Sequence, residues 1–356
     1  MHSLIEAIRM AQRGHVVWLA CCTGSRLEEE AEKENLNVFP LGVRSYFHPR
    51  LIIQLRRFVL DKAIMVVHCQ HSKDLATVVP AVNWAGRKIP VVLSKRVGSY
   101  VMKRDPLHRF TYGNVSRVLS ISEVIRKNVM ATTPMKPERV ITVHHGVDTD
   151  EFSPATARRA GVRNEFGVQE HEVLTGFVGR FSPGKGHEDF LQAAALLVRH
   201  HSHVRFVIVG EASYREQQYE SSIRALCGRL NLEGRVLFAG FRPDVPDVMA
   251  ALDIFAFPSH AESFGAVVVE AMALERPVVS TNCDGVLDIV VDGETGLYVN
   301  PGKPHELADA IARLIGDASL RERLGKAGRA RVMEMFDQRG MIDKIENIYL
   351  EVINEV

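Results

Sequence analysis

The chain has few cysteines, little aromatic content and no long hydrophobic run. Its 356 residues include five cysteines, an odd number without the paired spacing of a metal site. A disulfide framework is therefore not expected, and we predict a reducing, cytoplasmic environment. No apolar run approaches the roughly 18 residues that cross a bilayer, and the first residues lack a basic-then-apolar signal pattern. Any membrane contact is expected to be peripheral, at the inner face of the membrane.

Charge is balanced over the whole chain but uneven along it. Residues 1–150 hold 22 Lys and Arg against 13 Asp and Glu, whereas residues 151–356 hold 22 against 30. The basic first part can attract an anionic acceptor or a membrane surface, although a solvated face without a partner gives the same count. Aromatic residues are not interleaved with basic ones, so no nucleic-acid partner is expected.

Length and strand pattern predict two α/β domains. A chain of 356 residues exceeds the roughly 150 residues of an average domain. Short apolar runs alternate with helical patterns in two series, which is typical of parallel sheets. The first series predicts strands at 15–22, 63–69, 90–94, 117–121 and 140–144. The second predicts strands at 174–179, 204–210, 235–239, 254–258, 277–281 and 296–299.

Domain bounds follow from these two series. Residues 1–150 would form one Rossmann-like domain, 151–170 a polar linker that contains proline, and 171–340 a second Rossmann-like domain. Residues 341–356 predict a terminal helix. The first 14 residues predict a helix with no strand before it, so the opening strand of the N-terminal domain is expected to be missing.

A loop after the first strand of the second series carries two cations. Arg180 and Lys185 lie in a stretch rich in Gly and Pro, and a helical pattern follows near His187. Cations at such a position can meet a diphosphate. The loop narrowly misses a P-loop pattern, because Gly186 stands where a Mg²⁺-binding Ser or Thr would be needed, so an ATPase is not favoured.

Two carboxylates, eight residues apart, flank a predicted turn into a helix. Between Glu262 and Glu270, the run Ser263-Phe264-Gly265-Ala266 could present N–H groups to phosphate or to sugar hydroxyls. One helix spanning both acids would place them about 12 Å apart. That exceeds the roughly 5–9.5 Å of a glycosidase pair, so hydrolysis by paired carboxylates is disfavoured. Judged locally, Val267-Val268-Val269 also fits a buried strand.

Several motifs occur in order along the C-terminal half. They are His145-Gly146-Val147-Asp148, Gly179-Arg180 with Lys185-Gly186, Val209-Gly210-Glu211, Gly240-Phe241, and the segment from Glu262 to Glu270. Together they resemble the family 4 retaining glycosyltransferases, glycosyl transferases group 1, over nearly the whole chain. The resemblance implies a GT-B fold, in which two Rossmann-like domains face a cleft. It makes the N-terminal domain the acceptor side and the C-terminal domain the nucleotide-sugar side, with the helix at 341–356 joining the first domain.

The resemblance also implies roles for the residues of these motifs. Arg180 and Lys185 would stabilise negative charge as the sugar–phosphate bond breaks. Glu262 would hold the donor sugar's hydroxyls and complete the catalytic set, while Glu270 would hold the ribose. The donor-binding residues would be Gly179, Glu211, Gly240, Phe241, Arg242, Ser263, Phe264, Gly265, Ala266 and Glu270.

Polar residues at strand ends of the first domain mark an acceptor side. His68 and His71 could suggest a metal, but two ligands are too few, and such a pair more often lines a cleft or caps an element. Arg96 stands where many relatives carry a histidine, and it could stabilise an anionic acceptor or be part of a solvated basic face. Ser122 resembles the family's serine at a strand end. The acceptor-side residues are therefore expected to be His71, Arg96 and Ser122.

The expected function is transfer of a sugar from a nucleoside-diphosphate sugar to a hydroxyl acceptor with retention of configuration. A glycan, a lipid-linked acceptor or lipopolysaccharide would fit, in polysaccharide biosynthesis. No cofactor or metal is expected, because Arg180 and Lys185 would take the place of Mg²⁺. Two alternatives stay open: a GT-B epimerase of UDP-sugars, and a non-catalytic nucleotide-sugar-binding remnant that lacks the first strand and its Gly-rich loop.

Overall fold

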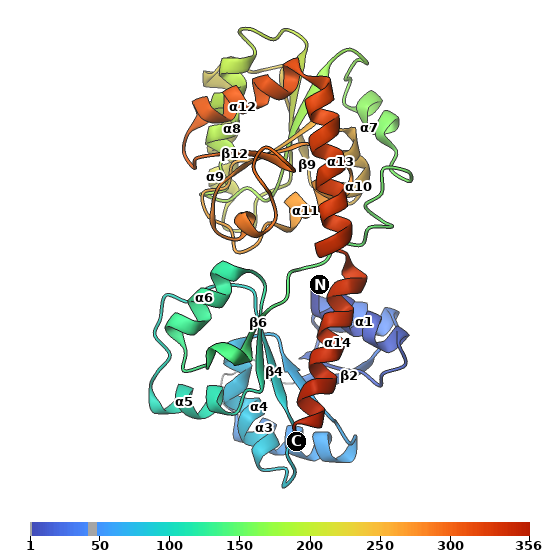
Figure 1. Cartoon of the computed structure of the whole chain (residues 1–356), viewed down its shortest axis with the longest axis vertical. Coiled ribbons are helices and arrows are strands. Elements are labelled where there is room, and N and C mark those ends of the chain that lie inside the picture. The colour runs from blue at the N-terminus through green and yellow to red at the C-terminus, as the bar shows by residue number, and fades with distance from the viewer. Residues whose placement is uncertain (1, 42–47) are drawn as a thin grey trace. The chain divides into compact units, whose positions relative to one another are not determined.

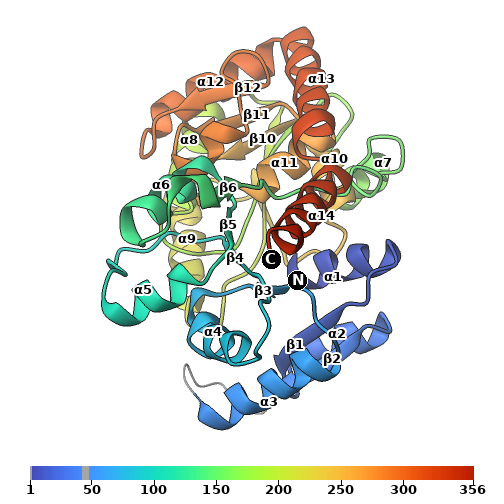
Figure 2. The same ribbon diagram turned by 60° about the horizontal axis from the view of Figure 1, so that its bottom comes forward.

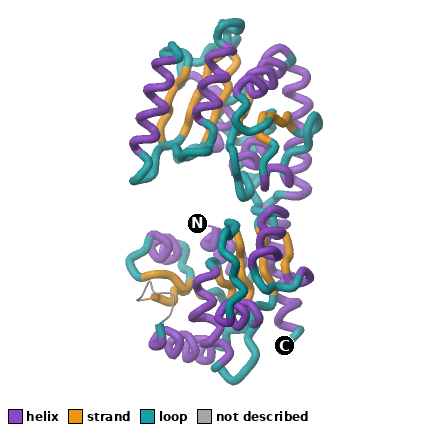
Figure 3. The backbone as a smooth tube through the Cα atoms, turned by 90° about the vertical axis from the view of Figure 1, so that its left-hand side faces the viewer, coloured by secondary structure: helices purple, strands orange, loops and turns teal. Residues whose placement is uncertain are grey.

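The computed structural model describes residues 2–41 and 48–356, and the chain divides into two compact units. Unit 1 comprises Met1–His144 and Arg339–Val356, and unit 2 comprises His145–Gln338. Each unit places helices on both sides of parallel strands, as the strand pattern predicted (Figure 1, Figure 3). The range 151–170, predicted as a linker, lies in unit 2 and contains helix α7 (Arg159–Glu165). The predicted domain bounds stay predictions.

Unit 1 holds two parallel sheets. One pairs β1 (Trp18–Cys22) with β2 (Asn37–Leu41), and the other has the order β3 (Val67–Cys69), β4 (Val91–Lys95), β5 (Arg117–Ser120), β6 (Val140–Thr142). Its helical segments are α1 (His2–Gln12), α2 (Arg26–Lys33), α3 (Pro49–Asp61), η1 (Ser72–Asp74), α4 (Leu75–Asn83), α5 (Pro106–Gly113), α6 (Glu123–Thr132), η2 (Pro137–Arg139) and α14 (Gln338–Asn354). Figure 2 shows β1, β2 and α2 side by side. The sequence pattern missed β2, because Pro40 argues against a strand.

Both faces of the four-stranded sheet in unit 1 are covered. On one face, side chains of α3, α4, α5 and α6 pack against the strands, with Leu75, Val79 and Tyr112 almost fully buried. On the other face, Ile342 and Ile345 of α14 and Met10 of α1 pack on Val92 and its neighbours. The predicted helices at both ends of the chain are therefore confirmed as α1 and α14. A strand before α1 stays untested.

Unit 2 is built on one six-stranded parallel sheet in the order β12-β11-β10-β7-β8-β9. Its strands are β7 (Val173–Val178), β8 (Val204–Val209), β9 (Val236–Gly240), β10 (Ile254–Phe257), β11 (Val278–Thr281) and β12 (Gly296–Val299), which confirms the second predicted series. From β7 the chain runs outward through β8 and β9, then returns to β10 on the other side of β7. The sheet therefore has a topological switch point between β7 and β10, the place where open α/β sheets bind ligands.

Helices cover both faces of this sheet (Figure 1). They are α7, α8 (His187–Leu197), α9 (Gln217–Arg229), α10 (Val245–Ala251), α11 (Ala266–Ala273), η3 (Asp284–Asp288), α12 (Pro304–Gly316) and α13 (Ala318–Met335). Helices α8, α9 and α12 pack together on one face, and α10, α11 and α13 lie on the other. The core between them buries Phe190, Phe206 and Ile208 almost completely. This packing fixes the strand ends that carry the candidate site.

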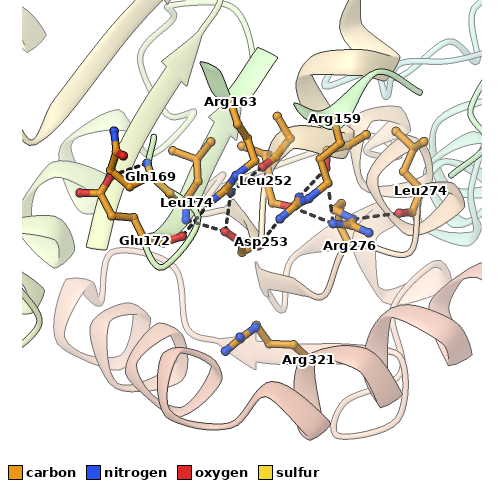
Figure 4. A network of polar contacts seen from close by, with 12 residues as sticks. Arg159, Arg163, Gln169, Glu172, Leu174, Leu252, Asp253, Leu274, Arg276 and Arg321 are labelled. Atoms are coloured by element: carbon orange, nitrogen blue, oxygen red, sulfur yellow. Dashed lines mark hydrogen bonds and ion pairs between the residues drawn. The ribbon is translucent and has the colours of Figure 1, made fainter. Parts of the chain in front are cut away.

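An arginine network holds α7 against the sheet of unit 2 (Figure 4). It lies at the N-terminal ends of the strands, opposite the ends that carry the candidate site. Asp253, directly before β10, accepts from Arg163 at 2.8 Å and from Arg159, and also from the Leu174 amide at 2.8 Å. Arg276 donates to the Leu252 carbonyl oxygen at 2.8 Å. Because every buried cation here has carboxylate or carbonyl partners, we interpret the network as structural.

Helix hydropathy and cysteine pairing can also be described for this fold. Within residues 2–41 and 48–356, we find no helix with the length and hydropathy needed to cross a bilayer. The five cysteines are unpaired thiols, and Cys22 alone among them is not buried. The expected absence of a disulfide framework therefore agrees with the fold.

Candidate functional site

The loop after β7 is pressed against the end of β10. Gly186, which precedes α8, has φ +82°, and a Cβ at this position would lie 2.0 Å from the carbonyl oxygen of Pro258. No other residue fits there, because both the left-handed backbone and the close approach require glycine. The contact is reinforced by the His260 amide, which donates to the Gly184 carbonyl oxygen at 2.8 Å. The loop with the two predicted cations is thereby fixed at the switch point.

Lys185 and Glu262 meet at this point. The Lys185 Nζ atom lies 2.5 Å from Glu262 Oε2, and the two side chains are 28% and 20% exposed. The residues are 77 positions apart in the chain. The structure therefore brings together two of the three predicted catalytic side chains, and both keep a solvent-accessible surface that a ligand can reach.

Arg180 projects further into solvent than Lys185. Its side chain is 59% exposed, and its Nε atom lies 3.5 Å from Glu216 Oε2. The Ser182 hydroxyl donates to Glu216 Oε1 at 2.5 Å, which holds that carboxylate in place. An exposed ion pair of this kind contributes little free energy. The guanidinium group can therefore exchange Glu216 for a ligand anion at small cost.

Glu262 lies in a loop that precedes α11. Its amide donates to Asp284 Oδ2 at 3.3 Å, and its carbonyl oxygen accepts from the Gly285 amide at 2.9 Å. A Cβ at Gly285 would lie 2.3 Å from the Ser263 carbonyl oxygen, so glycine is needed for this approach. Asp284 and Gly285 of η3 therefore support the segment that presents Glu262.

Helix α11 begins at Ala266, after Gly265, and not at Glu262. The alternative of a strand at Val267 to Val269 is wrong, because these residues are helical. The estimate of about 12 Å between the acids assumed one helix through both. Since only the second half of the interval is helical, helix rise does not set that separation. The first amides of α11, from Ala266 on, point away from the helix body and can bind anionic or hydroxyl groups.

Glu270 lies inside α11 in an environment that favours its neutral form. Burial, with a smaller effect from the negative charge of Glu151, raises the pKa of Glu270 to about 7. A carboxyl group with such a pKa changes its charge near neutral pH. Strongly perturbed carboxyl groups cluster at functional sites, although structural positions also show them.

Four further predicted donor residues, Gly179, Glu211, Gly240 and Phe241, lie at the ends of β7, β8 and β9. The Gly179 amide donates to Val209 at 2.9 Å, the Phe181 amide to Glu211 at 3.2 Å, and Gly240 accepts from the Gly210 amide at 2.8 Å. Phe241 is 66% exposed beside them. This edge is therefore a tightly bonded backbone surface with one accessible aromatic ring.

Arg242, which was predicted to bind the donor, is paired with carboxylates of the fold. Its guanidinium group contacts Asp244 at 2.7 Å and also pairs with Glu165 of α7. The hydrogen bonds that Arg242 donates to Asp244 and Glu165 raise its pKa further above the usual range. A contact between Arg242 and a donor stays a prediction, and it would compete with two carboxylates.

The sequence analysis missed a buried histidine directly behind the cation loop. His187 begins α8 and is fully buried between the rings of Phe177 and Phe181, whose centroids lie 4.4 Å and 4.5 Å away. Within the described part of the chain, neither ring nitrogen has a hydrogen-bond partner. Burial, assisted by the charge of Lys185, lowers the pKa of His187 to about 4. The ring is therefore a neutral packing element behind Lys185.

In unit 1, Arg96 is already bound within the fold. Its guanidinium group donates to Glu6 Oε1 at 2.7 Å and to Gln70 Oε1 at 2.6 Å. Glu6 lies on α1 and is buried, which raises the pKa of its carboxyl group above the usual value. Arg96 therefore joins the end of β4 to α1, and its role toward an acceptor stays a prediction.

Lys95, the neighbour of Arg96, is a buried cation. It is 8% exposed at the end of β4, and its Nζ atom donates to Ser72 Oγ at 3.3 Å. No carboxylate forms an ion pair with it in residues 2–41 or 48–356. Burial, with a contribution from Lys103, lowers its pKa to about 8. The sequence signal for this site was the pair Lys95-Arg96 at a strand end, but which cation was paired could not be read from it.

The other polar residues at this edge have structural partners. The Ser122 hydroxyl accepts from the Ile125 amide at 3.4 Å and caps α6. The His71 amide donates to Asp74 Oδ2 at 3.2 Å at the start of η1, and the ring of His71 is exposed. His68 is bonded through both nitrogens, to Tyr349 Oη at 2.5 Å and to Ser94 Oγ at 2.9 Å. Among the described residues, we find no group of three or more His, Cys, Asp or Glu arranged to hold a metal ion.

The architecture and the cation–carboxylate pair at the switch point define a GT-B type protein with a candidate anion site in its C-terminal unit. Comparison with family models agrees: residues 2–151 match the Glycosyltransferase Family 4 model, and residues 159–331 match the model of glycosyl transferases group 1. The chain belongs to family 4 of the glycosyltransferases, with a group 1 C-terminal domain.

Individual relatives give the same result. The chain is 29% identical to the alpha-D-kanosaminyltransferase of Streptomyces kanamyceticus, over 74% of this chain and 67% of that protein. It is 25% identical to N-acetyl-alpha-D-glucosaminyl L-malate synthase of Bacillus anthracis, over 93% and 79%. HepE of Anabaena in complex with UDP-glucose has a similar fold, with a TM-score of 0.81, 23% identity and coverage of 99% and 95%. The matches to the first five curated relatives span 46% to 67% of those proteins' lengths.

Proposed function

We propose that this protein transfers a sugar from a nucleoside-diphosphate sugar to a hydroxyl acceptor with retention of configuration. The observation that carries the proposal is the contact between Lys185 and Glu262 at the switch point of the six-stranded sheet. Lys185 can bind the diphosphate, and Glu262 can accept hydrogen bonds from the sugar hydroxyls. The two side chains lie close enough to contact the same donor. Family membership and the UDP-glucose complex of HepE support a nucleotide sugar as the donor.

In the proposed reaction, the bond between C1 of the sugar and the diphosphate oxygen breaks. The acceptor oxygen attacks C1 from the face on which the diphosphate leaves, and the acceptor proton passes to the leaving phosphate oxygen. Arg180 and Lys185 stabilise the negative charge that develops on the diphosphate, a contribution that is often the largest one in such catalysis. In this scheme the two cations make a metal unnecessary.

Glu262 and Glu270 bind the donor in this proposal. Glu262 accepts hydrogen bonds from the sugar when the diphosphate draws Lys185 away from it. Glu270 accepts from the ribose hydroxyls and, with a pKa near 7, does so best in its ionised form. The first amides of α11 lie between these two positions and add donors for the phosphate.

An anionic acceptor fits unit 1, with Lys95 as its contact. Lys95 is a buried cation that donates to a hydroxyl and has no carboxylate partner among the described residues, whereas Arg96 is paired with Glu6. A carboxylate or phosphate group on the acceptor would supply the missing partner. The relative of Bacillus anthracis, named for a malate-bearing glycoside, is consistent with an acceptor of this class. Glycan or lipid-linked acceptors that carry such a group are equally compatible.

A binding screen followed by a transfer assay tests the proposal. Thermal shifts with UDP, GDP, ADP and their sugars should identify one stabilising donor. Transfer with that donor, in the presence of a metal chelator, should continue, and the anomeric configuration of the product by NMR should match the donor's. Inversion would refute retention, and loss of turnover that Mg²⁺ restores would refute the two-cation account.

The same assay separates the alternatives. A UDP-sugar epimerase would form product without an acceptor, and the relatives do not favour it. A non-catalytic remnant would bind the donor and produce neither transfer nor hydrolysis with any acceptor offered.

A further inference from the structure

A histidine–aspartate pair beside the candidate site has no role in the proposed reaction. The His260 Nε2 atom lies 2.7 Å from Asp189 Oδ2, and the two side chains are 45% and 12% exposed. His260 belongs to the loop after β10, whereas Asp189 is the third residue of α8 and lies 71 positions away in the chain. The pair therefore joins two segments that are remote in sequence.

Both members of the pair are close in sequence to the residues that carry the proposed function. Asp189 follows Lys185 by four residues, and His260 precedes Glu262 by two. Lys185 Nζ and Glu262 Oε2 meet at 2.5 Å. The histidine–aspartate bond therefore links the same two segments whose charged side chains would contact the donor.

Hydrogen bonds fix both the main chain and the ring of His260. A carboxylate only accepts hydrogen bonds, so Nε2 carries the ring proton and donates to Asp189. On the main chain, the His260 amide donates to the Gly184 carbonyl oxygen at 2.8 Å. Asp189 lies in the first turn of α8, where the helix dipole favours a negative charge. His260 is thus held twice by the segment that carries Lys185.

Glu262 is supported on its other side by η3. Its amide donates to Asp284 Oδ2 at 3.3 Å, and its carbonyl oxygen accepts from the Gly285 amide at 2.9 Å. The main chain at Glu262 therefore runs between two supports, η3 after it and His260 before it. A side chain that contacts a ligand precisely depends on such supporting residues, even though they do not contact the ligand themselves.

We propose that the hydrogen bond between Asp189 and His260 positions Glu262 opposite Lys185 for contact with the donor sugar. His260 is a positioning residue in this scheme, because it acts through Glu262. The inference rests on the proposed function, in which Glu262 holds the sugar hydroxyls and Lys185 the diphosphate. Loss of the bond should therefore weaken the grip on the sugar and spare the nucleoside diphosphate. A pair that only stabilises α8 would change the melting temperature and neither affinity.

Calorimetry on the full chain tests the proposal with a nucleotide sugar and with its free nucleoside diphosphate. The probes are UDP-glucose and UDP, or the matching pair that the thermal-shift screen selects. His260→Ala and Asp189→Ala should each weaken binding of the nucleotide sugar about fivefold, the effect of one lost hydrogen bond, and leave binding of the free diphosphate unchanged. His260→Gln should restore the wild-type affinity, because its side-chain amide can donate to Asp189 in place of Nε2.

His108→Ala is the matched control. It breaks a second histidine–aspartate contact, between His108 and Asp105 of α5 in unit 1, and should change neither affinity. Equal weakening of the nucleotide sugar and the free diphosphate by His260→Ala would overturn the proposal. So would unchanged binding of both ligands, which would leave the pair a stabilising contact of α8.

A double-mutant cycle shows whether His260 acts through Glu262. Glu262→Ala should weaken binding of the nucleotide sugar, and His260→Ala added to it should cause no further loss. Additive losses would mean that His260 acts independently of Glu262, and they would refute the positioning role. If Glu262→Ala leaves the affinity unchanged, the proposed function is wrong at this residue and the inference falls with it. If Glu262→Ala lowers the affinity and His260→Ala does not, only the positioning role is wrong.

Discussion

The two units carry polar side chains at the same edge of their parallel sheets but use them differently. In unit 2, Lys185 and Glu262 face each other with exposed surface remaining, and Arg180 is held by one weak contact. In unit 1, Arg96 is bound by Glu6 and Gln70, and Ser122 caps a helix. Lys95 is the exception in unit 1, because its charge is buried beside a hydroxyl.

This difference indicates that the strand ends of unit 2 form a site for a large ligand. The polar groups at the strand ends of unit 1 mostly hold the fold together. In unit 2 the Arg180 side chain is exposed and the Lys185–Glu262 pair keeps accessible surface, so that a donor can reach both cations. In unit 1 the polar groups bind α1, α6 and α14 to the sheet, and breaking them would leave buried groups unpaired. Substitutions in unit 2 should therefore change turnover and leave stability intact, whereas most substitutions in unit 1 should do the reverse.

The largest effect is expected for Lys185→Ala. Loss of one preorganised donor to the diphosphate should lower kcat by about 100- to 1000-fold, while thermal stability stays close to that of the wild type. Lys326→Ala is the matched control, because Lys326 Nζ also lies 2.5 Å from a carboxylate, Glu322, but on the exposed face of α13. Steady-state kinetics and thermal denaturation of both variants measure the contrast. Unchanged turnover in Lys185→Ala would show that the site in unit 2 is misassigned.

Lys95→Met should have the next largest effect on turnover, through the acceptor alone. Without its cation, the edge of unit 1 should bind an anionic acceptor more weakly, and KM for the acceptor should rise about tenfold with the donor affinity unchanged. Stability should not fall, since a buried charge without a carboxylate partner is removed.

Arg96→Met, at the adjacent residue, should instead reduce the stability of the fold. It leaves Glu6 buried without its cation, so the free energy of unfolding should drop by about 3 kcal/mol, measured by denaturant titration. If Lys95→Met instead destabilises the chain and leaves KM unchanged, Lys95 belongs to the structural network like Arg96.

The contrast also explains which parts of the molecule could be predicted from the sequence. Strand positions in both units followed from apolar runs, and β2 escaped because of Pro40. The loop with Arg180 and Lys185 was found because its spacing is local and its motifs follow one another in order. The start of α11 was uncertain, since β-branched Val267 to Val269 fit a strand as well as a helix until packing decides.

Contacts between residues that are far apart in the chain could not be predicted from the sequence. Glu6 and Arg96 are 90 positions apart, and His68 and Tyr349 are 281 apart, so nothing local indicates that they meet. The same applies to burial: Lys95 and Arg96 are adjacent cations, and only the fold decides which one is neutralised. The predicted acceptor side therefore included Arg96, with His71 and Ser122, because of its position in a motif and without knowledge of Glu6.

A pH titration of donor binding sharpens the description of unit 2. With the pKa of Glu270 near 7, the ionised fraction rises from about one tenth at pH 6 to about nine tenths at pH 8. If the ionised form accepts from the ribose, donor affinity should rise about tenfold over this range. Calorimetry should use the donor sugar nucleotide found in the screen, because its diphosphate diester does not titrate here.

Glu270→Gln is the control for that titration, and it should bind weakly with no dependence on pH between 6 and 8. It also has a stability signature. Because the folded pKa lies above the unfolded one, Glu270 destabilises the fold as pH rises from about 4.5 through 7. The variant should therefore melt higher than wild type at pH 8. A pH dependence that persists in Glu270→Gln would assign the titration to another group.

The smallest effect tests the comparison through two buried histidines, one in each unit. His187 packs among aromatic rings with both nitrogens unbonded, whereas His68 bonds to Tyr349 and Ser94. His187→Leu should therefore stabilise the chain by about 1 kcal/mol, and His68→Leu should destabilise it by about 1–3 kcal/mol by leaving two hydroxyls unpaired.

Burial lowers the pKa of His187 to about 4, and the unfolded state takes up its proton from about pH 6.5 downward. Wild type thus loses stability as pH falls through this window, so the advantage of His187→Leu should be larger at pH 5 than at pH 7.5 in thermal denaturation. Destabilisation by His187→Leu at both pH values would mean that a buried water or the ring itself supports the loop that holds Lys185, and the internal bonding that distinguishes unit 1 would then extend to the site of unit 2.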